Sequence, residues 1–133
     1  MKYDKMNVSS FEILAEGVRV LANETKGLEA LAKSLGPDFV RAVELLWSTE
    51  GRVAVTGMGK SGHVARKVAA TLASTGTPAY FIHPAEASHG DLGMISLNDV
   101  LIAYSNPGET QEMVEILAFC ARPQIPVIGV TKN

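Results

Sequence analysis

Residues 57–62, Gly-Met-Gly-Lys-Ser-Gly, place glycines beside a lysine and a serine directly after a short apolar run. Val53 and Val55 of that run suit a buried parallel strand, and glycines let the backbone turn sharply and approach a ligand closely. A helix that begins near Ser61 would present unpaired N–H groups and the positive end of its dipole beside the ammonium group of Lys60. We therefore predict a strand, a tight turn and a helix that together bind a phosphate group.

Three kinds of phosphate-binding loop have a pattern of this type. A nucleotide P-loop requires a glycine five positions before the Gly-Lys-Ser sequence, and this chain has Ala54 there, so we reject that type. The glycines match the G-x-G-x-x-G of dinucleotide-binding loops, but the next apolar run ends in His83 and Pro84, where that fold needs an acidic residue to bind the ribose. The third type, a sugar-phosphate loop, requires a second phosphate-binding segment elsewhere in the chain.

A candidate for this second segment is the sequence Ser-Asn-Pro-Gly-Glu-Thr at residues 105–110, which follows another apolar run. The hydroxyl groups of Ser105 and Thr110, the amide of Asn106 and free N–H groups at a helix start would all donate to an anion. An ordinary turn in which Thr110 caps a helix would have the same composition. Two such segments at neighbouring strand ends could close on one phosphate and leave Lys60 near the rest of the ligand.

The connection at residues 84–93 is too polar for a core and too long for a simple turn, and such connections are usually functional. It carries Glu86 and His89, and we favour a functional role for this histidine because it lies among carboxylates. We expect His63, inside the first helical turn, to be structural, and His83 stays undecided. We expect no metal site, because no pair of residues has the H-x-x-x-H or C-x-x-C spacing of a strong metal motif.

From residue 52 onward, short apolar strands alternate with helices. We expect strands at 52–57, 79–84, 100–105 and 126–131, and helices near 61–75 and 109–120. Fully apolar strands separated by helices indicate an α/β fold, in which a doubly wound parallel sheet is covered on both faces and the crossovers are right-handed. In such sheets the ligand lies beyond the carboxyl ends of the strands.

Two helices are expected before the first strand. Ser9 and Glu12 form a capping box, and apolar residues then recur at three- and four-residue spacing up to Leu35. This pattern predicts one long amphipathic helix that ends at the Gly36-Pro37 sequence, and a second helix is expected over residues 38–49. The apolar face of the long helix would pack either over the edge of the sheet or against another subunit, and we leave both alternatives open.

Length and composition limit the class of protein. A chain of 133 residues is expected to fold as one domain without covalent staples, and its single cysteine, Cys120, lies in an apolar stretch and should be buried. A net charge of −2 is not typical of proteins that bind nucleic acids or anionic membranes. The sequence has no signal peptide and no apolar run of membrane-spanning length, so we expect a cytoplasmic protein.

Three segments in this order and spacing, GMGKSGH, STGTPAYFIHPAEASHGDLG and SNPGET, closely resemble the sugar isomerase (SIS) domain, and within it the KpsF/GutQ-type arabinose-5-phosphate isomerases. The resemblance covers nearly the whole chain. It implies interconversion of D-arabinose 5-phosphate and D-ribulose 5-phosphate on the route to Kdo for lipopolysaccharide or capsule. It also implies a three-layer, flavodoxin-like fold with a five-stranded parallel sheet, a homodimer or homotetramer, and no organic cofactor.

The resemblance also implies roles for residues at matching positions. Phosphate binding is expected from Gly59, Ser61, Ser105, Asn106 and Thr110, catalysis from Lys60, His89 and Glu112, and further contacts with the substrate from Glu86 and Glu109. Moving a carbonyl group between C1 and C2 requires a base that transfers a proton and a cation that stabilises the enediolate oxygen. Glu112 suits the first task, Lys60 suits the second, and His89 would open the sugar ring or move the hydroxyl proton.

Two departures from the family pattern limit what the resemblance implies. Pro107 replaces a serine of the family's S-N-S-G-E-T and removes a hydroxyl and an N–H donor, each worth roughly 1.5–3 kcal/mol, so phosphate affinity would fall about tenfold to a hundredfold. Residues 1–133 are expected to form a single SIS domain without the family's last strand, its closing helices and its paired CBS domains. A non-catalytic, regulatory SIS module that binds sugar phosphates is therefore the main alternative, ahead of a dinucleotide-dependent oxidoreductase.

Overall fold

The structure, a computed structural model, describes residues 9–87, 89–106 and 111–132. The chain divides into two compact units, residues 1–40 and residues 41–133. The first unit contains the helix α1, Ser10–Ser34, and the second contains the sheet. A helix α2, Pro37–Ser48, runs from the first unit into the second, one residue earlier at each end than predicted.

Helix α1 begins at the predicted capping box. The Ser9 hydroxyl accepts a hydrogen bond from the Glu12 N–H at 3.2 Å, and the Glu12 carboxylate accepts one from the Ser9 N–H at 2.8 Å. The hydrogen bonds that the Glu12 carboxylate accepts from the Ser9 N–H and the Ser9 hydroxyl lower the pKa of Glu12, because they favour its charged form. No residue of α1 is buried, and apolar side chains such as Phe11, Leu21 and Leu28 are 79%, 69% and 67% exposed. The long helix is thus confirmed, with its apolar face exposed.

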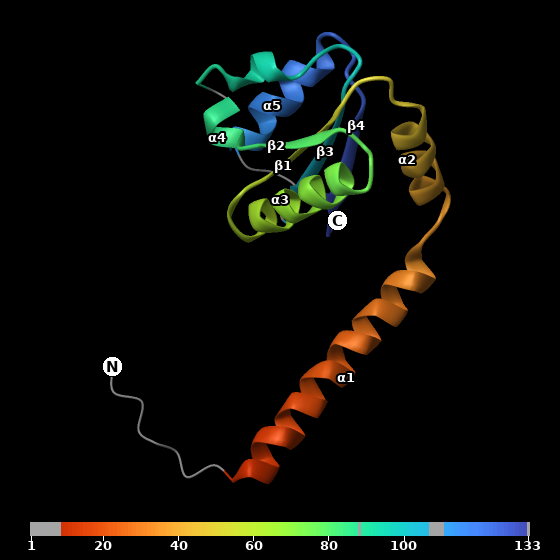
Figure 1. The fold of residues 1–133 in the computed structure, drawn as a ribbon, viewed down its shortest axis with the longest axis vertical. Coiled ribbons are helices and arrows are strands. Elements are labelled where there is room, and N and C mark those ends of the chain that lie inside the picture. The colour runs from red at the N-terminus through yellow and green to blue at the C-terminus, as the bar shows by residue number, and fades with distance from the viewer. Residues whose placement is uncertain (1–8, 88, 107–110, 133) are drawn as a thin grey trace. The chain divides into compact units, whose positions relative to one another are not determined.

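The described residues of the second unit form four parallel strands in the order β2-β1-β3-β4 (Figure 1). Their bounds are Val53–Gly57 for β1, Ala79–Ile82 for β2, Val100–Ser105 for β3 and Val127–Thr131 for β4. All four strands were predicted from their apolar runs, and the predicted α/β class and parallel sheet are confirmed. Because β1 lies between β2 and β3, the direction of strand addition reverses at β1, which is where ligands bind in sheets of this kind.

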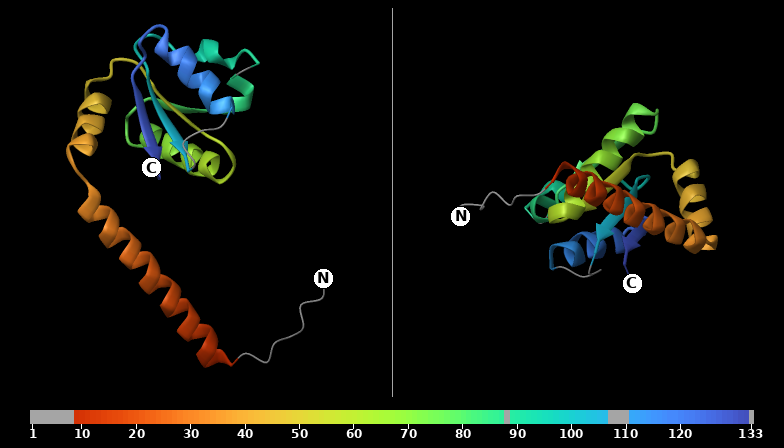
Figure 2. Two further views of the ribbon diagram at one scale, coloured as in Figure 1. Left: turned by 180° about the vertical axis from the view of Figure 1, so that it is seen from behind. Right: turned by 90° about the horizontal axis from the view of Figure 1, so that it is seen from below.

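Helices cover both faces of this sheet, so the predicted three-layer arrangement is also confirmed. Helix α3, Gly59–Ser74, lies on one face, and helix α5, Gln111–Ala121, lies on the other (Figures 1 and 2). Alternate residues of β1 serve the two cores: Val53 and Val55 pack with residues of α3, and Ala54 packs with residues of α5. Cys120 belongs to the α5 core, where burial raises the pKa of its thiol, so it is buried as expected.

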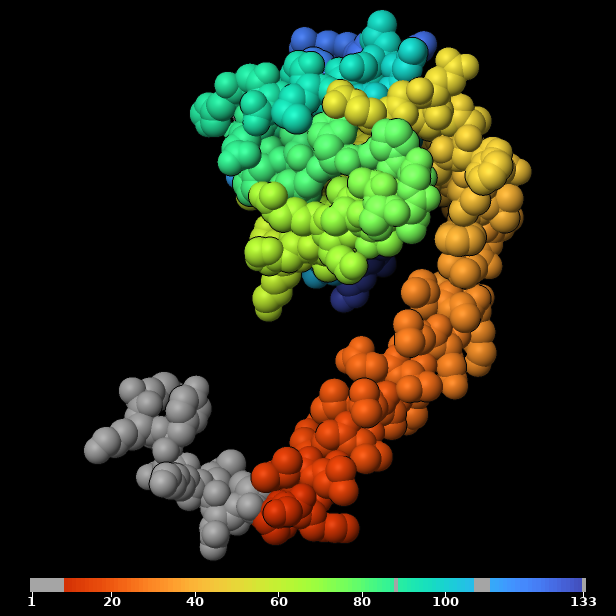
Figure 3. All heavy atoms as spheres, in the orientation of Figure 1, coloured from red at the N-terminus to blue at the C-terminus, as the bar shows by residue number. Residues whose placement is uncertain are grey.

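The described residues of the connection after β2 include two short helical turns, which the polar sequence of residues 84–93 did not indicate. These are a short helix α4, Pro84–Ala87, and a 3-10 helix η1, Asp91–Met94, which both lie at the surface (Figure 3). Proline is favoured in the first turn of a helix, and the His83 ring nitrogen Nδ1 accepts a hydrogen bond from the Ala85 N–H at 3.2 Å. Short helical turns of this kind have no hydrophobic periodicity that would reveal them in a sequence.

The apolar side chains of α2 differ in their exposure. Trp47 on α2 is 91% exposed, while the neighbouring Leu45 and Leu46 pack against the α3 core. None of the helices within residues 9–87, 89–106 and 111–132 combines the length and apolarity that a membrane-spanning helix needs.

Candidate functional site

The turn between β1 and α3 brings two backbone segments unusually close. A Cβ atom added to Gly62 would lie 2.6 Å from the carbonyl oxygen of Gly57, and one added to Gly57 would lie 2.9 Å from the backbone of Ser61. Gly59 has a φ of +54°, which residues with a side chain rarely adopt. The glycines therefore let the first turn of α3 pack directly on the end of β1, and this places Lys60 and Ser61 at the carboxyl edge of the sheet.

A cavity of about 280 Å³ lies at this edge, where β1 and β3 end and α3 and α5 begin. The described residues that line it are Met58, Lys60, Ser61, Tyr104, Ser105, Asn106 and Met113. The two segments that we predicted to bind one phosphate thus meet in a single cavity. They do so because β1 and β3 are adjacent and parallel, so their carboxyl ends lie side by side.

The lining of this cavity suits an anionic ligand. It offers the ammonium group of Lys60, the hydroxyl groups of Ser61 and Ser105 and the amide of Asn106, and no carboxylate stands among the lining residues that the structure describes. Ser105 is a buried part of this lining, at 7% exposure. A cation with several hydroxyl and amide donors is the arrangement that binds a phosphate group.

Other predicted site residues lie near this cavity or outside the described part of the chain. Glu112 is half-buried in the first turn of α5, next to Met113, but does not line the cavity. Thr110, Glu109 and Pro107 fall outside the residues that the structure describes, so their predicted roles stay predictions.

His89 and Glu86 are not among the described residues that line the cavity, although helix α4, which carries Glu86, contacts α5. The two residues follow β2, which is on the opposite side of β1 from β3, and both are exposed. The His89 N–H donates to the Glu86 carbonyl at 2.9 Å, so the two residues form part of one turn. The structure therefore divides the three predicted catalytic residues, with Lys60 in the cavity, Glu112 beside it and His89 on the neighbouring connection.

A second cavity, of about 190 Å³, lies on this other side of β1 and was not predicted. Its lining includes His63, Arg66, Phe81 and His83, and the Arg66 guanidinium lies 4.0 Å from the centre of the Phe81 ring. His63, which we expected to be structural, is exposed and faces this cavity. The three-residue spacing of two basic side chains at the start of α3 was the signal that could have drawn attention to it.

Tyr104 and Met113 of the first cavity were also missed. Burial raises the pKa of the Tyr104 phenol, so it stays protonated and can donate a hydrogen bond toward the cavity at neutral pH.

Within the ranges that the structure describes, no three side chains of His, Cys, Asp or Glu gather in a way that could hold a metal ion. The expectation that the site works without a metal stays a prediction.

Comparison with known protein families now identifies the fold. Residues 45–133 match the SIS domain, which is two-thirds of the chain and includes both cavities. The chain therefore belongs to the SIS-domain family. The resemblance noted from the three sequence segments is thereby confirmed, and the four strands described here are part of an SIS domain.

Several curated relatives are arabinose 5-phosphate isomerases named KdsD. The protein from Pseudomonas aeruginosa is 50% identical over 129 residues, which cover 96% of this chain and 40% of that protein. The protein from Escherichia coli K12 is 46% identical over 121 residues, which cover 91% of this chain and 37% of that protein. The chain thus spans about 40% of the length of the relatives that it matches.

Solved structures with the same fold include proteins that bind or act on sugar phosphates. A structure of E. coli CFT073 c3406 in complex with a phosphosugar superposes with a TM-score of 0.88 at 39% identity, over 95% of this chain and 67% of that one. A putative sugar-phosphate isomerase from Listeria monocytogenes superposes with a TM-score of 0.89 at 29% identity, over 96% of this chain and 67% of that one.

Proposed function

We propose that this chain is the SIS portion of an aldose-ketose isomerase that interconverts D-arabinose 5-phosphate and D-ribulose 5-phosphate. The observation that carries the proposal is the cavity in which Lys60, Ser61, Ser105 and Asn106 meet at the reversal point of the sheet. Two findings support the choice of substrate: the KdsD relatives are named arabinose 5-phosphate isomerases, and the similar structure of E. coli c3406 holds a phosphosugar. In a cell such an enzyme would act in the cytoplasm, where sugar phosphates are made.

In this proposal the phosphate of the substrate binds to Ser61, Ser105 and Asn106, with Thr110 as a further donor. Gly59, which lines the second cavity rather than this one, would add its N–H from the same turn. Lys60 lines the same cavity as Ser61, and in this proposal its ammonium group contacts the sugar beyond the phosphate. An anchored phosphate fixes the distance from the cavity wall to C1 and C2. Fixing this distance turns proton transfer into a reaction within a single complex.

Glu112 takes the proton from C2 of the open-chain aldose, and the freed electron pair forms the C1–C2 double bond of a cis-enediolate. Lys60 stabilises the negative charge that develops on O1. Return of the proton to C1, with transfer of the O2 proton to O1, completes the ketose. His89 lies on the β2 side of the site, so we assign it ring opening or proton transfer between the two oxygens, and Glu86 and Glu109 contact the sugar hydroxyls.

Proton NMR of arabinose 5-phosphate incubated with the protein in D2O tests this proposal. We expect ribulose 5-phosphate that carries deuterium at C1, and recovered aldose that carries deuterium at C2, because a carboxylate base exchanges its proton with solvent. If no conversion occurs but arabinose 5-phosphate raises the melting temperature, the chain is a sugar-phosphate-binding module without catalysis. Stabilisation by NAD rather than by the sugar phosphate would indicate a dinucleotide-binding protein.

We also propose that the chain forms a homodimer or homotetramer through the apolar face of α1, which is exposed along its length. Replacing both Leu21 and Leu28 with Glu is expected to lower the molar mass measured by light scattering after gel filtration to that of a single chain, because charged side chains on a buried apolar face are costly. The matched control replaces Lys26 and Lys33 with Glu on the polar side of the same helix and should keep the wild-type mass. An unchanged mass in the leucine variant would exclude this face as the contact.

A further inference from the structure

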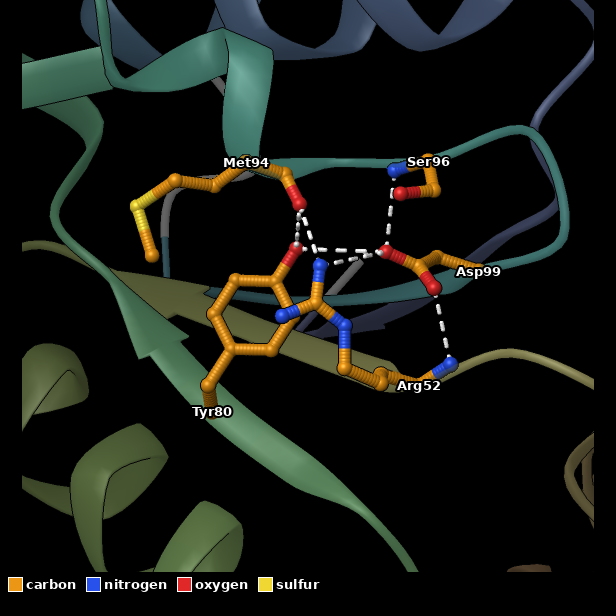
Figure 4. A network of polar contacts seen from close by, with 5 residues as sticks. All are labelled: Arg52, Tyr80, Met94, Ser96 and Asp99. Atoms are coloured by element: carbon orange, nitrogen blue, oxygen red, sulfur yellow. Dashed lines mark hydrogen bonds and ion pairs between the residues drawn. The ribbon is translucent and has the colours of Figure 1, made fainter.

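A network of polar contacts lies at the opposite edge of the sheet from the cavity, where the strands begin. Arg52 directly precedes β1, Asp99 directly precedes β3, and Tyr80 is the second residue of β2 (Figure 4). None of these three residues lines either of the cavities described above. The network is therefore remote from the bound phosphate of the proposed substrate.

Asp99 is the buried centre of this network, at 2% exposure. Its Oδ1 accepts a hydrogen bond from the Arg52 N–H at 2.7 Å, and its Oδ2 accepts one from the Ser96 N–H at 2.9 Å. The Arg52 Nη2 lies 3.6 Å from Oδ2, and its guanidinium lies 4.4 Å from the centre of the Tyr80 ring. A buried carboxylate is tolerated only with such partners, so the three side chains hold one another in place.

The network is bonded to η1 through the carbonyl oxygen of Met94. This oxygen accepts hydrogen bonds from the Arg52 Nη2 at 2.6 Å and from the Tyr80 hydroxyl at 3.0 Å (Figure 4). Burial and the nearby carboxylate raise the pKa of Tyr80 to about 12, so the phenol remains a donor at neutral pH. Met94 is the last residue of η1, and the network thus fixes the end of the segment that begins after β2.

The segment from α4 to η1 is held by hydrogen bonds between its own backbone groups. The N–H groups of Ala87, His89, Gly90, Gly93 and Ile95 donate to carbonyls three or four residues earlier, at 2.9–3.4 Å. Ala87 and Ile95 are buried in the α5 core, at 1% and 6% exposure. His89 and Glu86 therefore stand on a series of turns that is fixed at one end by β2 and at the other by the contacts of Arg52 and Tyr80 with Met94.

We propose that Arg52, Tyr80 and Asp99 are positioning residues that hold residues 86–94 in place and through them set the turnover rate. The consequence for turnover rests on the proposed function, in which His89 and Glu86 act on the sugar. The phosphate-binding residues follow β1 and β3 and do not depend on this segment. Loss of the network should therefore lower kcat and leave phosphate binding unchanged, a division that general destabilisation would not produce.

Kinetics of Arg52→Met, Arg52→Lys and Tyr80→Phe test this proposal, with Arg122→Met as the control that removes an exposed arginine from the same unit. We expect Arg52→Met to lower kcat for arabinose 5-phosphate about tenfold to a hundredfold, since small misplacements of reacting groups have effects of this size. Arg52→Lys should recover much of this loss because its ammonium can still donate to the Met94 carbonyl. Tyr80→Phe removes one donor and should have a smaller effect. Inhibition by inorganic phosphate should stay within about twofold of wild type in all variants.

Hydrogen exchange of the same proteins gives a readout that does not need activity. In Arg52→Met, amides of residues 86–94 should exchange faster while those of β1 and β3 exchange as in wild type. Full kcat in Arg52→Met, or unchanged exchange in residues 86–94, would overturn the positioning role even if the wild-type protein isomerises the sugar. A wild-type protein that does not isomerise the sugar would overturn the proposed function instead, and hydrogen exchange would then decide whether the network holds the segment. If Arg52→Met does not fold, Tyr80→Phe decides by the same two measurements.

Discussion

Glu112→Gln is expected to lower kcat for the isomerisation of arabinose 5-phosphate by about 10²- to 10⁴-fold, because an amide cannot accept the C2 proton. The substitution keeps the size and shape of the side chain, so the packing of α5 against the sheet should be preserved. Glu112 is half-buried in the first turn of α5, and the next residue, Met113, lines the cavity that holds Lys60 and Ser61. A carboxylate at this place is one helix position away from the cavity wall.

The measurement is the rate of deuterium incorporation at C2 of arabinose 5-phosphate in D2O, compared with inhibition of the same proteins by inorganic phosphate. Exchange at C2 should fall as far as kcat, while phosphate inhibition should change less than about threefold, because the phosphate-binding residues are on other segments. Glu115→Gln, which changes an exposed carboxylate on the same helix, is the matched control and should retain wild-type exchange. Normal exchange in Glu112→Gln would rule out this residue as the base.

Much of the fold was predictable because the signals are local. The four strands are short runs of apolar residues, of which β1 and β3 are buried almost throughout, β2 in part and β4 hardly at all. The capping box marks the start of α1 within a few residues. Once the strands are taken to be parallel, their carboxyl ends must share one edge. That single step predicted that Lys60 and Ser61 would meet Ser105 and Asn106, and the structure places all four in one cavity.

The order of the strands has no such local signal, so the sequence could not show which predicted site residues share one cavity. His89 was grouped with Lys60 and Glu112 from a family resemblance. The chain adds β2 on one side of β1 and β3 on the other, and His89, on the connection after β2, is not among the described residues that line the phosphate cavity. Only the paired strands of the folded sheet reveal this arrangement.

Contacts between residues far apart in the chain were invisible for a related reason. Arg52 and Asp99 are 47 residues apart, and neither belongs to a motif that predicts a partner. Their types suggest an exposed cation and an exposed anion, yet Asp99 is almost completely buried. The network at the start of the strands is therefore a property of tertiary packing, in which a parallel sheet brings the residues before β1 and β3 together.

Gly62→Ala is expected to have the second large effect, on stability as well as on activity. The added Cβ would lie 2.6 Å from the Gly57 carbonyl oxygen. This oxygen belongs to the backbone, so it cannot move away by a change of rotamer as a side-chain atom could. Helix α3 would have to move away from the end of β1, and overpacking of this kind costs about 1–3 kcal/mol in the free energy of unfolding. We expect the melting temperature to fall by about 5–15 °C, as measured by calorimetry.

The same displacement should weaken substrate binding, because Lys60 and Ser61 lie on the first turn of α3 and would move with it. KM for arabinose 5-phosphate should rise about tenfold or more, as expected when a phosphate loses a charge-assisted hydrogen bond. Gly129→Ala in β4 is the control: its added Cβ meets only a side-chain atom of Thr131, at 4.0 Å, so both the melting temperature and KM should stay close to wild type. A stable Gly62→Ala protein with normal KM would show that the turn does not need the close approach of β1 and α3 to bind phosphate, and that the phosphate site depends mainly on the residues after β3.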